Sequence, residues 1–226
     1  MTPPIKLAIG VPAYGAHVVM WHTRMWLTMG AALANSAERF ALVSFDLVDA
    51  CGIDVARNKL VHDALEKGAD WLLMIDADTW AEDGGDILQM ISDADKADQA
   101  ESGWKPVGAV VAPVPRRDPW DTRPMVYARV PEGFRDQLVN IDLKPEGLQF
   151  VDSAATAMMA INLGFIRGVG WMAPWFSFEW HSSKTPWKPS LSEDHVFCRR
   201  VRESGGVILA DPRVKAKHLQ RPQVIE

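Results

Sequence analysis

Apolar residues in the first half of the chain fall into short dense runs separated by longer stretches at helical spacing. Four runs are typical of strands buried on both faces: 5–12, 40–48, 71–75 and 106–114. Three stretches between them are predicted helices: about 17–34, 54–66 with Asp54 as the N-cap, and 84–100. Strands that alternate with helices in this way predict an α/β fold, with a mostly parallel sheet and helices on both faces.

The second half has a different pattern. The segments 123–130 and 148–162 are strand-like, with no long helix between them, which indicates antiparallel additions. A helix is predicted over 193–204, where Ser192 is a suitable N-cap and Gly205–Gly206 a stop signal. No internal repeat and no linker divides the 226 residues. We therefore expect one domain, 1–226, with a doubly wound first half fused to a mixed second half.

Composition narrows the class of protein. The net charge of -5 argues against a general nucleic-acid coat, although a local basic groove stays possible. Cys51 and Cys198 lie far apart, which excludes a cysteine-built zinc site and favours a reducing compartment. The first residues lack the features of a secretory signal, and no apolar run approaches the roughly 18 residues of a membrane span. A cytoplasmic protein without a membrane span is expected.

The tripeptide Asp-Ala-Asp occurs twice, in different surroundings. Asp93 and Asp95 belong to a predicted helix, where neighbouring acids point in different directions and are usually solvated. Asp76 and Asp78 follow the dense run 71–75, at the carboxyl end of a buried strand, which is where open α/β sheets bind ligands. Two carboxylates suit Mg²⁺ or Mn²⁺ shared with substrate phosphates. From these residues alone, a metal site and a solvated strand end are equally good interpretations.

Four segments in order carry a resemblance to a known family. They are VPAYG at 11–15, DVARNKLVHDALEKGADWLLMIDADTW at 54–80, SEDHVFCRRVRESGG at 192–206 and DPRVKAKHL at 211–219. Their order and spacing resemble glycosyltransferases of the GT-A fold, family 2-like in the broad sense, from about residue 5 to residue 218. The resemblance implies transfer of a sugar from a nucleotide-sugar to an acceptor hydroxyl. It also implies a nucleotide-binding half at about 1–112 and an acceptor half at about 113–226.

The resemblance assigns a metal site and a catalytic base. Asp76 and Asp78 match the acids that bind a divalent metal on the diphosphate of the donor, and His218 matches a histidine that completes the metal shell. Such a cation, Mn²⁺ or Mg²⁺, stabilises the charge of the departing phosphate. Glu193 or Asp194 matches the base of inverting members, which takes the proton of the acceptor hydroxyl. Acids at a helix N-terminus are also favoured by the helix dipole alone, without catalysis.

The donor pocket is assigned in the same way. Pro12 and Tyr14 would lie beside the nucleotide base, and Arg57 would approach the base or the diphosphate. Asp46 is the candidate for the acid that recognises the base, and a UDP-sugar is the first expectation for the donor. The segment SAATAMMAIN, 153–162, departs from the family because relatives often carry a glycine-rich patch there. The size of the acceptor is therefore open.

Aromatic residues gather between Trp171 and Trp187, interleaved with prolines and polar residues. This pattern favours a loop that acts as a lid on the acceptor over core packing, because sugar rings stack on aromatic faces. Three rival functions have different requirements. A nucleotidyltransferase would need a glycine- and arginine-containing loop after the first strand, a glycosyltransferase of modified DNA would take a nucleic-acid acceptor, and a non-catalytic carbohydrate-binding protein would need neither acid cluster.

Overall fold

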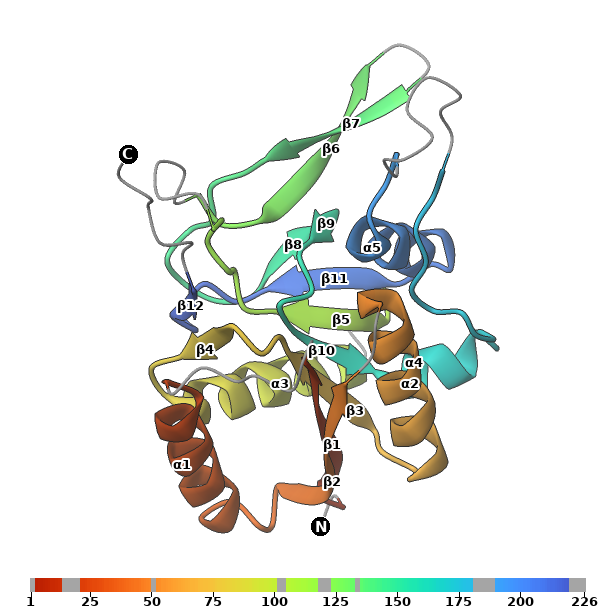
Figure 1. Cartoon of the computed structure of the whole chain (residues 1–226). Coiled ribbons are helices and arrows are strands. Elements are labelled where there is room, and N and C mark those ends of the chain that lie inside the picture. Colours follow the sequence, from red (N-terminus) through yellow and green to blue (C-terminus); the bar gives the residue numbers. More distant parts are fainter. Residues whose placement is uncertain are drawn as a thin grey trace.

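The structure is a computed structural model, and it describes residues 3–13, 21–49, 52–100, 105–117, 123–132, 135–180 and 190–219. Over this part of the chain, seven strands form a central sheet in the order β2-β1-β3-β10-β5-β11-β8 (Figure 1). Five of these strands run parallel: β1 (Ile5–Ala13), β2 (Phe40–Asp49), β3 (Trp71–Ile75), β5 (Val107–Val111) and β11 (Val207–Ala210). The antiparallel members are β10 (Met158–Asn162), between β3 and β5, and β8 (Gln149–Val151), at the edge.

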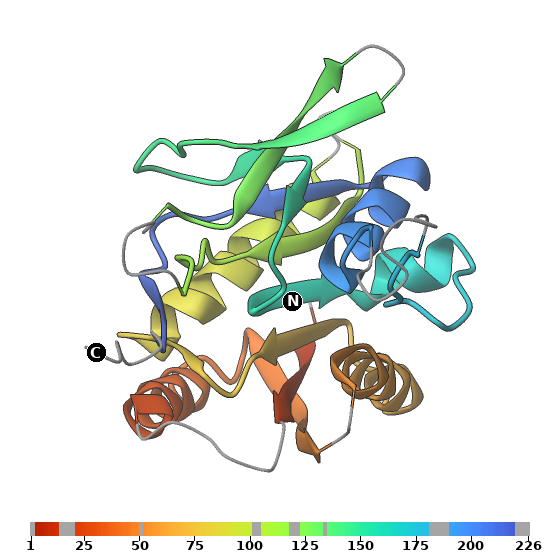
Figure 2. The same cartoon turned by 45° about the horizontal axis from the view of Figure 1, so that its top comes forward.

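Helices cover both faces of the sheet, as the alternating pattern predicts. The helices α1 (Trp21–Ala34) and α3 (Gly84–Gln99) bury Met25, Met29 and Ile87 against one face. The opposite face is covered by α2 (Ile53–Glu66), α4 (Leu163–Gly168) and α5 (Glu193–Glu203), with Leu60 and Phe197 among the buried residues. Figure 2 shows the two helix layers on either side of the strands. The strands β3, β5 and β10 are buried throughout, which explains their dense apolar runs.

The second half adds two small antiparallel sheets. A three-stranded sheet contains β6 (Val126–Glu132), β7 (Arg135–Asn140) and β9 (Ser153–Ala154), and its β6–β7 hairpin extends away from the main sheet (Figure 1). A two-stranded sheet pairs β4 (Thr79–Ala81) with β12 (Ala216–His218). Among the described residues, no helix is long and apolar enough to cross a membrane.

The antiparallel additions predicted for the second half are confirmed, and one local prediction is wrong. The segment 148–162 forms β8, β9 and β10, all in antiparallel pairings, and only β10 lies between two strands. Asp54 is in the first turn of α2 rather than at its N-cap, which is Gly52. Ser192 is the N-cap of α5, as predicted, and Gly205 ends that helix with a positive φ of 84°.

Candidate active site

The carboxyl edge of the parallel strands brings together the ends of several elements. Asp76 follows β3 directly, and its N–H donates to the carbonyl of Ala157, just before β10. The helices α2 and α5 each precede a parallel strand, so they run against the strand direction and begin at this edge. Arg57 lies one turn into α2, and the pair Glu193–Asp194 begins α5. Residues 136 positions apart in the chain, Arg57 and Glu193, therefore meet at one place.

Arg57 connects the acids of these segments. Its side chain is 3% exposed, and its Nη2 donates to the two carboxylate oxygens of Asp76 at 3.0 and 3.1 Å. Its Nη1 donates to Oε1 of Glu193 at 2.5 Å and to Oδ1 of Asp194 at 2.8 Å. The guanidinium also lies over the ring of Phe176, 5.9 Å from its centroid. One buried cation thus contacts three carboxyl groups, one just after β3 and two at the start of α5.

The two acids of α5 have different protonation states near neutral pH. Burial, followed by the charge of Asp194 and a hydrogen bond with it, raises the pKa of Glu193 to about 8. Burial acts to raise the pKa of Asp194 as well, but the charge of Arg57 and the hydrogen bonds from Glu193 and Thr156 lower it. Glu193 therefore carries a proton at pH 7, whereas Asp194 is ionised. The two carboxyl groups share one proton.

A second cluster lies beside the first. The antiparallel pairing of β4 with β12 places His218 opposite Thr79, so that Nε2 of His218 lies 3.3 Å from Oδ1 of Asp78. Arg117, in the segment after β5, donates from Nη2 to Oδ2 of Asp78 and from Nε to Nε2 of His218, the latter at 2.9 Å. Burial acts to raise the pKa of Asp78, but His218 and Arg117 lower it. Asp78 is therefore an anion, held by two basic side chains.

The residues predicted to bind metal are only partly brought together. Asp78 and His218 lie in contact, whereas Asp76 faces Arg57. Within the described ranges, no group of three or more His, Cys, Asp or Glu side chains is arranged to hold a metal ion. A carboxylate and an imidazole nitrogen nevertheless fit a divalent cation that takes its other ligands from water and from substrate phosphates, as Mg²⁺ and its analogues commonly do.

The predicted donor-pocket residues lie at different places. Pro12 is buried near the end of β1, opposite Val48 of β2. Tyr14 lies outside the described residues. Asp46 is in β2, and both of its carboxylate oxygens accept from Nζ of Lys67 at 2.8 Å. Lys67 is at the opposite end of α2 from Arg57, so Asp46 contacts neither Arg57 nor Asp76. The roles of Pro12, Tyr14 and Asp46 stay predictions.

The second Asp-Ala-Asp copy has structural partners. Asp93 and Asp95 lie in α3, as predicted. Asp93 accepts from Nη2 of Arg213 at 2.8 Å, and Asp95 accepts from Nε1 of Trp71 at 3.0 Å. These carboxylates bind α3 to Arg213 and to Trp71, so the prediction that they are merely solvated is wrong. Within the described residues, these partners differ from those of Asp76 and Asp78.

The aromatic segment is only partly the exposed loop that the sequence favours. Trp175 and Phe176 are 5% and 0% exposed, and Phe176 stacks on Phe197 of α5 with ring centroids 4.6 Å apart. They belong to the core because Asn58, next to Arg57, accepts from both of their N–H groups and donates to the Phe176 carbonyl. Trp180, in contrast, is 57% exposed. Trp187 lies outside the described residues.

Two contacts were not anticipated from the sequence. The hydroxyl of Thr156 donates to Oδ1 of Asp194 at 3.1 Å, and a lone threonine in an alanine-rich segment carries no signal of that role. Arg117 contacts both Asp78 and His218, although exposed loop arginines are usually solvated. His195, next to Asp194 in the chain, contacts Ser153 through Nδ1 at 2.6 Å and packs edge-on against Tyr127.

Comparison with solved structures identifies the architecture. A197 from STIV matches with a TM-score of 0.51 at 15% identity, over 98% of this chain and 97% of that chain. The glycosyltransferase GalNAc-T7, solved with UDP, GalNAc and Mn²⁺, matches with a TM-score of 0.52 at 11% identity. The chain has a GT-A-like fold. The match to GalNAc-T7 covers 97% of this chain but only 45% of the other. No protein-family model and no curated protein sequence matches.

Proposed function

We propose that this protein is a glycosyltransferase that moves a sugar from a nucleoside-diphosphate sugar to an acceptor hydroxyl, with inversion. The observation that carries the proposal is the contact of Arg57 with Asp76 on one side and with Asp194 on the other. It places an acid of the predicted donor site next to the predicted base, at the carboxyl edge of a GT-A-like sheet. GalNAc-T7, with UDP and Mn²⁺, supports a UDP-sugar as the first donor to test.

Asp194 is the better candidate for the base. It is ionised near neutral pH because Arg57 lowers its pKa, whereas Glu193 holds a proton. Its side chain is 20% exposed, against 9% for Glu193. Within the described residues, its Oδ2 has one long contact, 3.5 Å from the N–H of Thr156, while Oδ1 receives Arg57 and Thr156. Oδ2 thus keeps lone pairs that can accept a proton from an acceptor hydroxyl.

The transfer follows from these positions. Asp194 takes the acceptor proton as the acceptor oxygen attacks the anomeric carbon of the sugar, and the bond from that carbon to the diphosphate oxygen breaks. Asp78 and His218 would hold a divalent cation, Mn²⁺ or Mg²⁺, which supplies Lewis-acid stabilisation of the departing diphosphate when bound. Arg57 is a positioning residue that fixes the separation of Asp76 and Asp194, with Phe176 packed against its guanidinium.

The two halves of the chain have separate tasks in this proposal. Residues of about 1–112 bind the donor, with Pro12 and Tyr14 beside the nucleotide base and Asp46 as a lesser candidate. Residues of about 113–226 bind the acceptor, and the exposed Trp180 is suited to stack on a sugar ring. A carbohydrate is the first acceptor class to test, and modified DNA is the alternative. The reducing compartment favoured by the low cysteine content makes the cytoplasm the proposed location.

A panel of nucleotide-sugars tests the proposal. Each donor is added with Mn²⁺, and both thermal stabilisation and release of nucleoside diphosphate are measured with and without candidate acceptors. We expect one donor class to stabilise the protein and to be turned over, and Asp194→Asn to lower turnover by about 10²–10⁴-fold while the stabilisation remains. Sugar binding without release of nucleoside diphosphate from any donor would indicate a carbohydrate-binding protein of the same fold. Full turnover by the Asp194→Asn and Glu193→Gln variants would contradict the inverting mechanism.

A further inference from the structure

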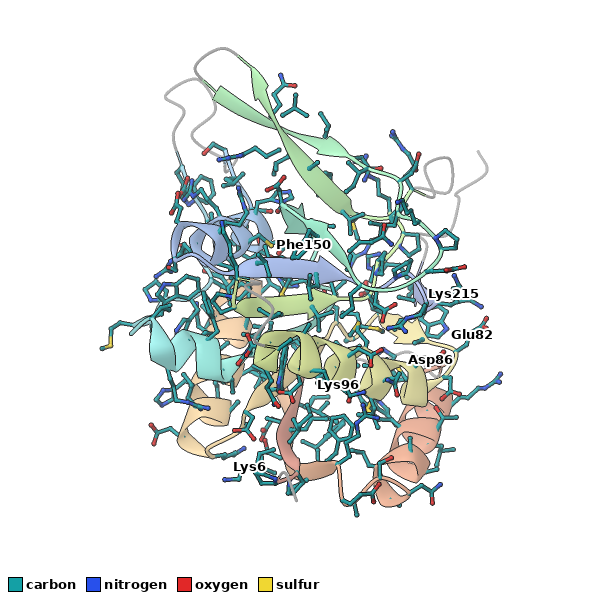
Figure 3. The ribbon with its side chains drawn as sticks, turned by 180° about the vertical axis from the view of Figure 1, so that it is seen from behind. Lys6, Glu82, Asp86, Lys96, Phe150 and Lys215 are labelled. Atoms are coloured by element: carbon teal, nitrogen blue, oxygen red, sulfur yellow. The ribbon has the colours of Figure 1, made fainter. Side chains whose placement is uncertain are left out.

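The guanidinium of Arg117 donates hydrogen bonds to the same two atoms that would bind a metal ion, Oδ2 of Asp78 and Nε2 of His218. These two side chains are the metal ligands of the proposed function. Arg117 lies six residues beyond the end of β5, and its side chain is 46% exposed. Figure 3 views the molecule from behind, and in it Glu82, just after β4, and Lys215, just before β12, lie on the same side of the molecule.

Both ring nitrogens of His218 have partners. Nε2 lies 2.9 Å from Nε of Arg117 and 3.3 Å from Oδ1 of Asp78. Nδ1 lies 3.2 Å from the carbonyl oxygen of Pro115, which can only accept, so Nδ1 donates to it. A ring N–H held by a backbone carbonyl is the usual support of a metal-binding histidine. Nε2, the nitrogen that would bind a metal, is therefore the one that contacts Arg117.

Arg117 and a metal ion exclude one another on His218. Nε2 can bind a metal only through its single lone pair in the plane of the ring. The N–H of Arg117 is directed at that lone pair. Arg117 must therefore leave His218 before Nε2 can ligate a metal. Pro115 and Arg117 lie in the same short segment after β5. This segment therefore orients the imidazole of His218 through Pro115 and supplies Arg117, which competes with a metal ion for Nε2.

We propose that Arg117 is an internal counter-cation that competes with the divalent cation for Asp78 and His218 and is released when the metal and the donor diphosphate bind together. The proposal rests on the proposed function for the identity of the two ligands. Without a metal, Arg117 neutralises Asp78 and keeps the pair assembled. The arriving diphosphate offers the displaced guanidinium an anionic partner, so the metal binds more tightly in the presence of the nucleotide than alone. Metal and nucleotide binding are thereby coupled.

The experiment is a Mn²⁺ titration followed by electron paramagnetic resonance, with and without UDP, and it does not depend on turnover. We expect Arg117→Ala to bind Mn²⁺ alone about tenfold more tightly than the unmodified protein, because a charge-assisted contact no longer has to be broken. We also expect UDP to increase the Mn²⁺ affinity of this variant by a smaller factor. Lys215→Ala is the matched control, since it removes an exposed cation before β12 whose Nζ contacts only the carbonyl of Pro212 among the described residues.

The outcomes separate this inference from the proposed function. Tighter Mn²⁺ binding by Arg117→Ala, but not by Lys215→Ala, supports competition. Equal or weaker binding by Arg117→Ala, together with loss of binding in Asp78→Asn, overturns the inference and leaves the metal site intact. Absence of Mn²⁺ binding in every variant, with or without UDP, overturns the inference and the metal site of the proposed function together.

Discussion

A single proton distinguishes the two acids that begin α5. Glu193 and Asp194 are neighbours in sequence, and Arg57 contacts both. Burial and the adjacent charge keep Glu193 protonated, and this proton in turn stabilises the ionised form of Asp194 through their hydrogen bond. The sequence shows two equivalent acids at a helix start and cannot rank them. The contacts with Arg57 and Thr156, made across more than 30 residues of sequence, provide the ranking.

The first prediction concerns Asp194. Asp194→Asn preserves the shape of the side chain but removes its capacity to accept a proton. We expect turnover to fall by about 10²–10⁴-fold, the usual loss for one general base, with donor affinity nearly unchanged. Steady-state kinetics and calorimetric titration of the donor measure the two quantities. Glu193→Gln is the matched control, and because Glu193 is already neutral at pH 7, it should retain most of the turnover. The opposite ranking of the two variants would make Glu193 the base.

The second prediction separates the two Asp-Ala-Asp copies. Asp78→Ala should abolish Mn²⁺-dependent binding of UDP, because it removes the carboxylate that contacts His218. Asp93→Ala should leave that binding intact and lower the free energy of unfolding by at most about 1 kcal/mol, because its partner Arg213 is a largely exposed cation. Calorimetric titration and denaturant unfolding test both variants. Equal losses of UDP binding in the two would refute the distinction between the copies.

Elements explain which part of the fold could be predicted from the sequence. Strands such as β3 and β5 are buried on both faces of the sheet, so nearly all of their residues are apolar. Such a run can be recognised in the sequence without knowing which strands pair with it. The two-stranded sheet of β4 and β12 was not predicted, because each strand has three residues and gains its structure from a partner about 140 residues away. That pairing places His218 beside Asp78. Local pattern therefore misses this pairing, and the expectation that His218 lies near Asp78 comes from the family resemblance alone.

The third prediction concerns the packing of α1 on α3. A Cβ added at Gly84 would lie 2.4 Å from Cβ of Met29 and 2.6 Å from the carbonyl oxygen of Met25. Backbone cannot yield as a flexible side chain can, so Gly84→Ala should force the helices apart and cost about 1–3 kcal/mol of unfolding free energy. Gly85→Ala is the control in the next position, where the nearest atom is the Asp83 carboxylate at 3.2 Å. Denaturant unfolding compares the two, and an equal stability for both would contradict the close packing.

At the scale of the whole molecule, the candidate site joins the two halves of the chain. Arg57 belongs to the first half, and Glu193 and Asp194 belong to the second, yet the side chain of Arg57 is buried between them. Asn58 holds the segment 175–176 in the same region. The arrangement of α2 against α5 is thus maintained by polar contacts as well as by Phe176 stacked on Phe197. Protonation in this cluster should consequently be detectable in the stability of the entire domain.

The fourth prediction gives the sign of that pH dependence. The pKa of Glu193 is about 8 in the folded protein, above its ordinary value of 4.5. Between these values the folded state binds a proton that the unfolded state has lost, so the contribution of Glu193 is fully present below about pH 4.5 and disappears as the pH rises through 8. Glutamine resembles the protonated acid and does not titrate. As the pH rises from about 5.5 to about 8.5, the unfolding free energy of the unmodified protein should therefore fall relative to that of Glu193→Gln. Measurements about 0.5 pH units apart cover this range. Denaturant unfolding of both proteins at each pH measures this difference, and a difference that is constant or that grows in the opposite direction would show that Glu193 is ionised in the folded protein.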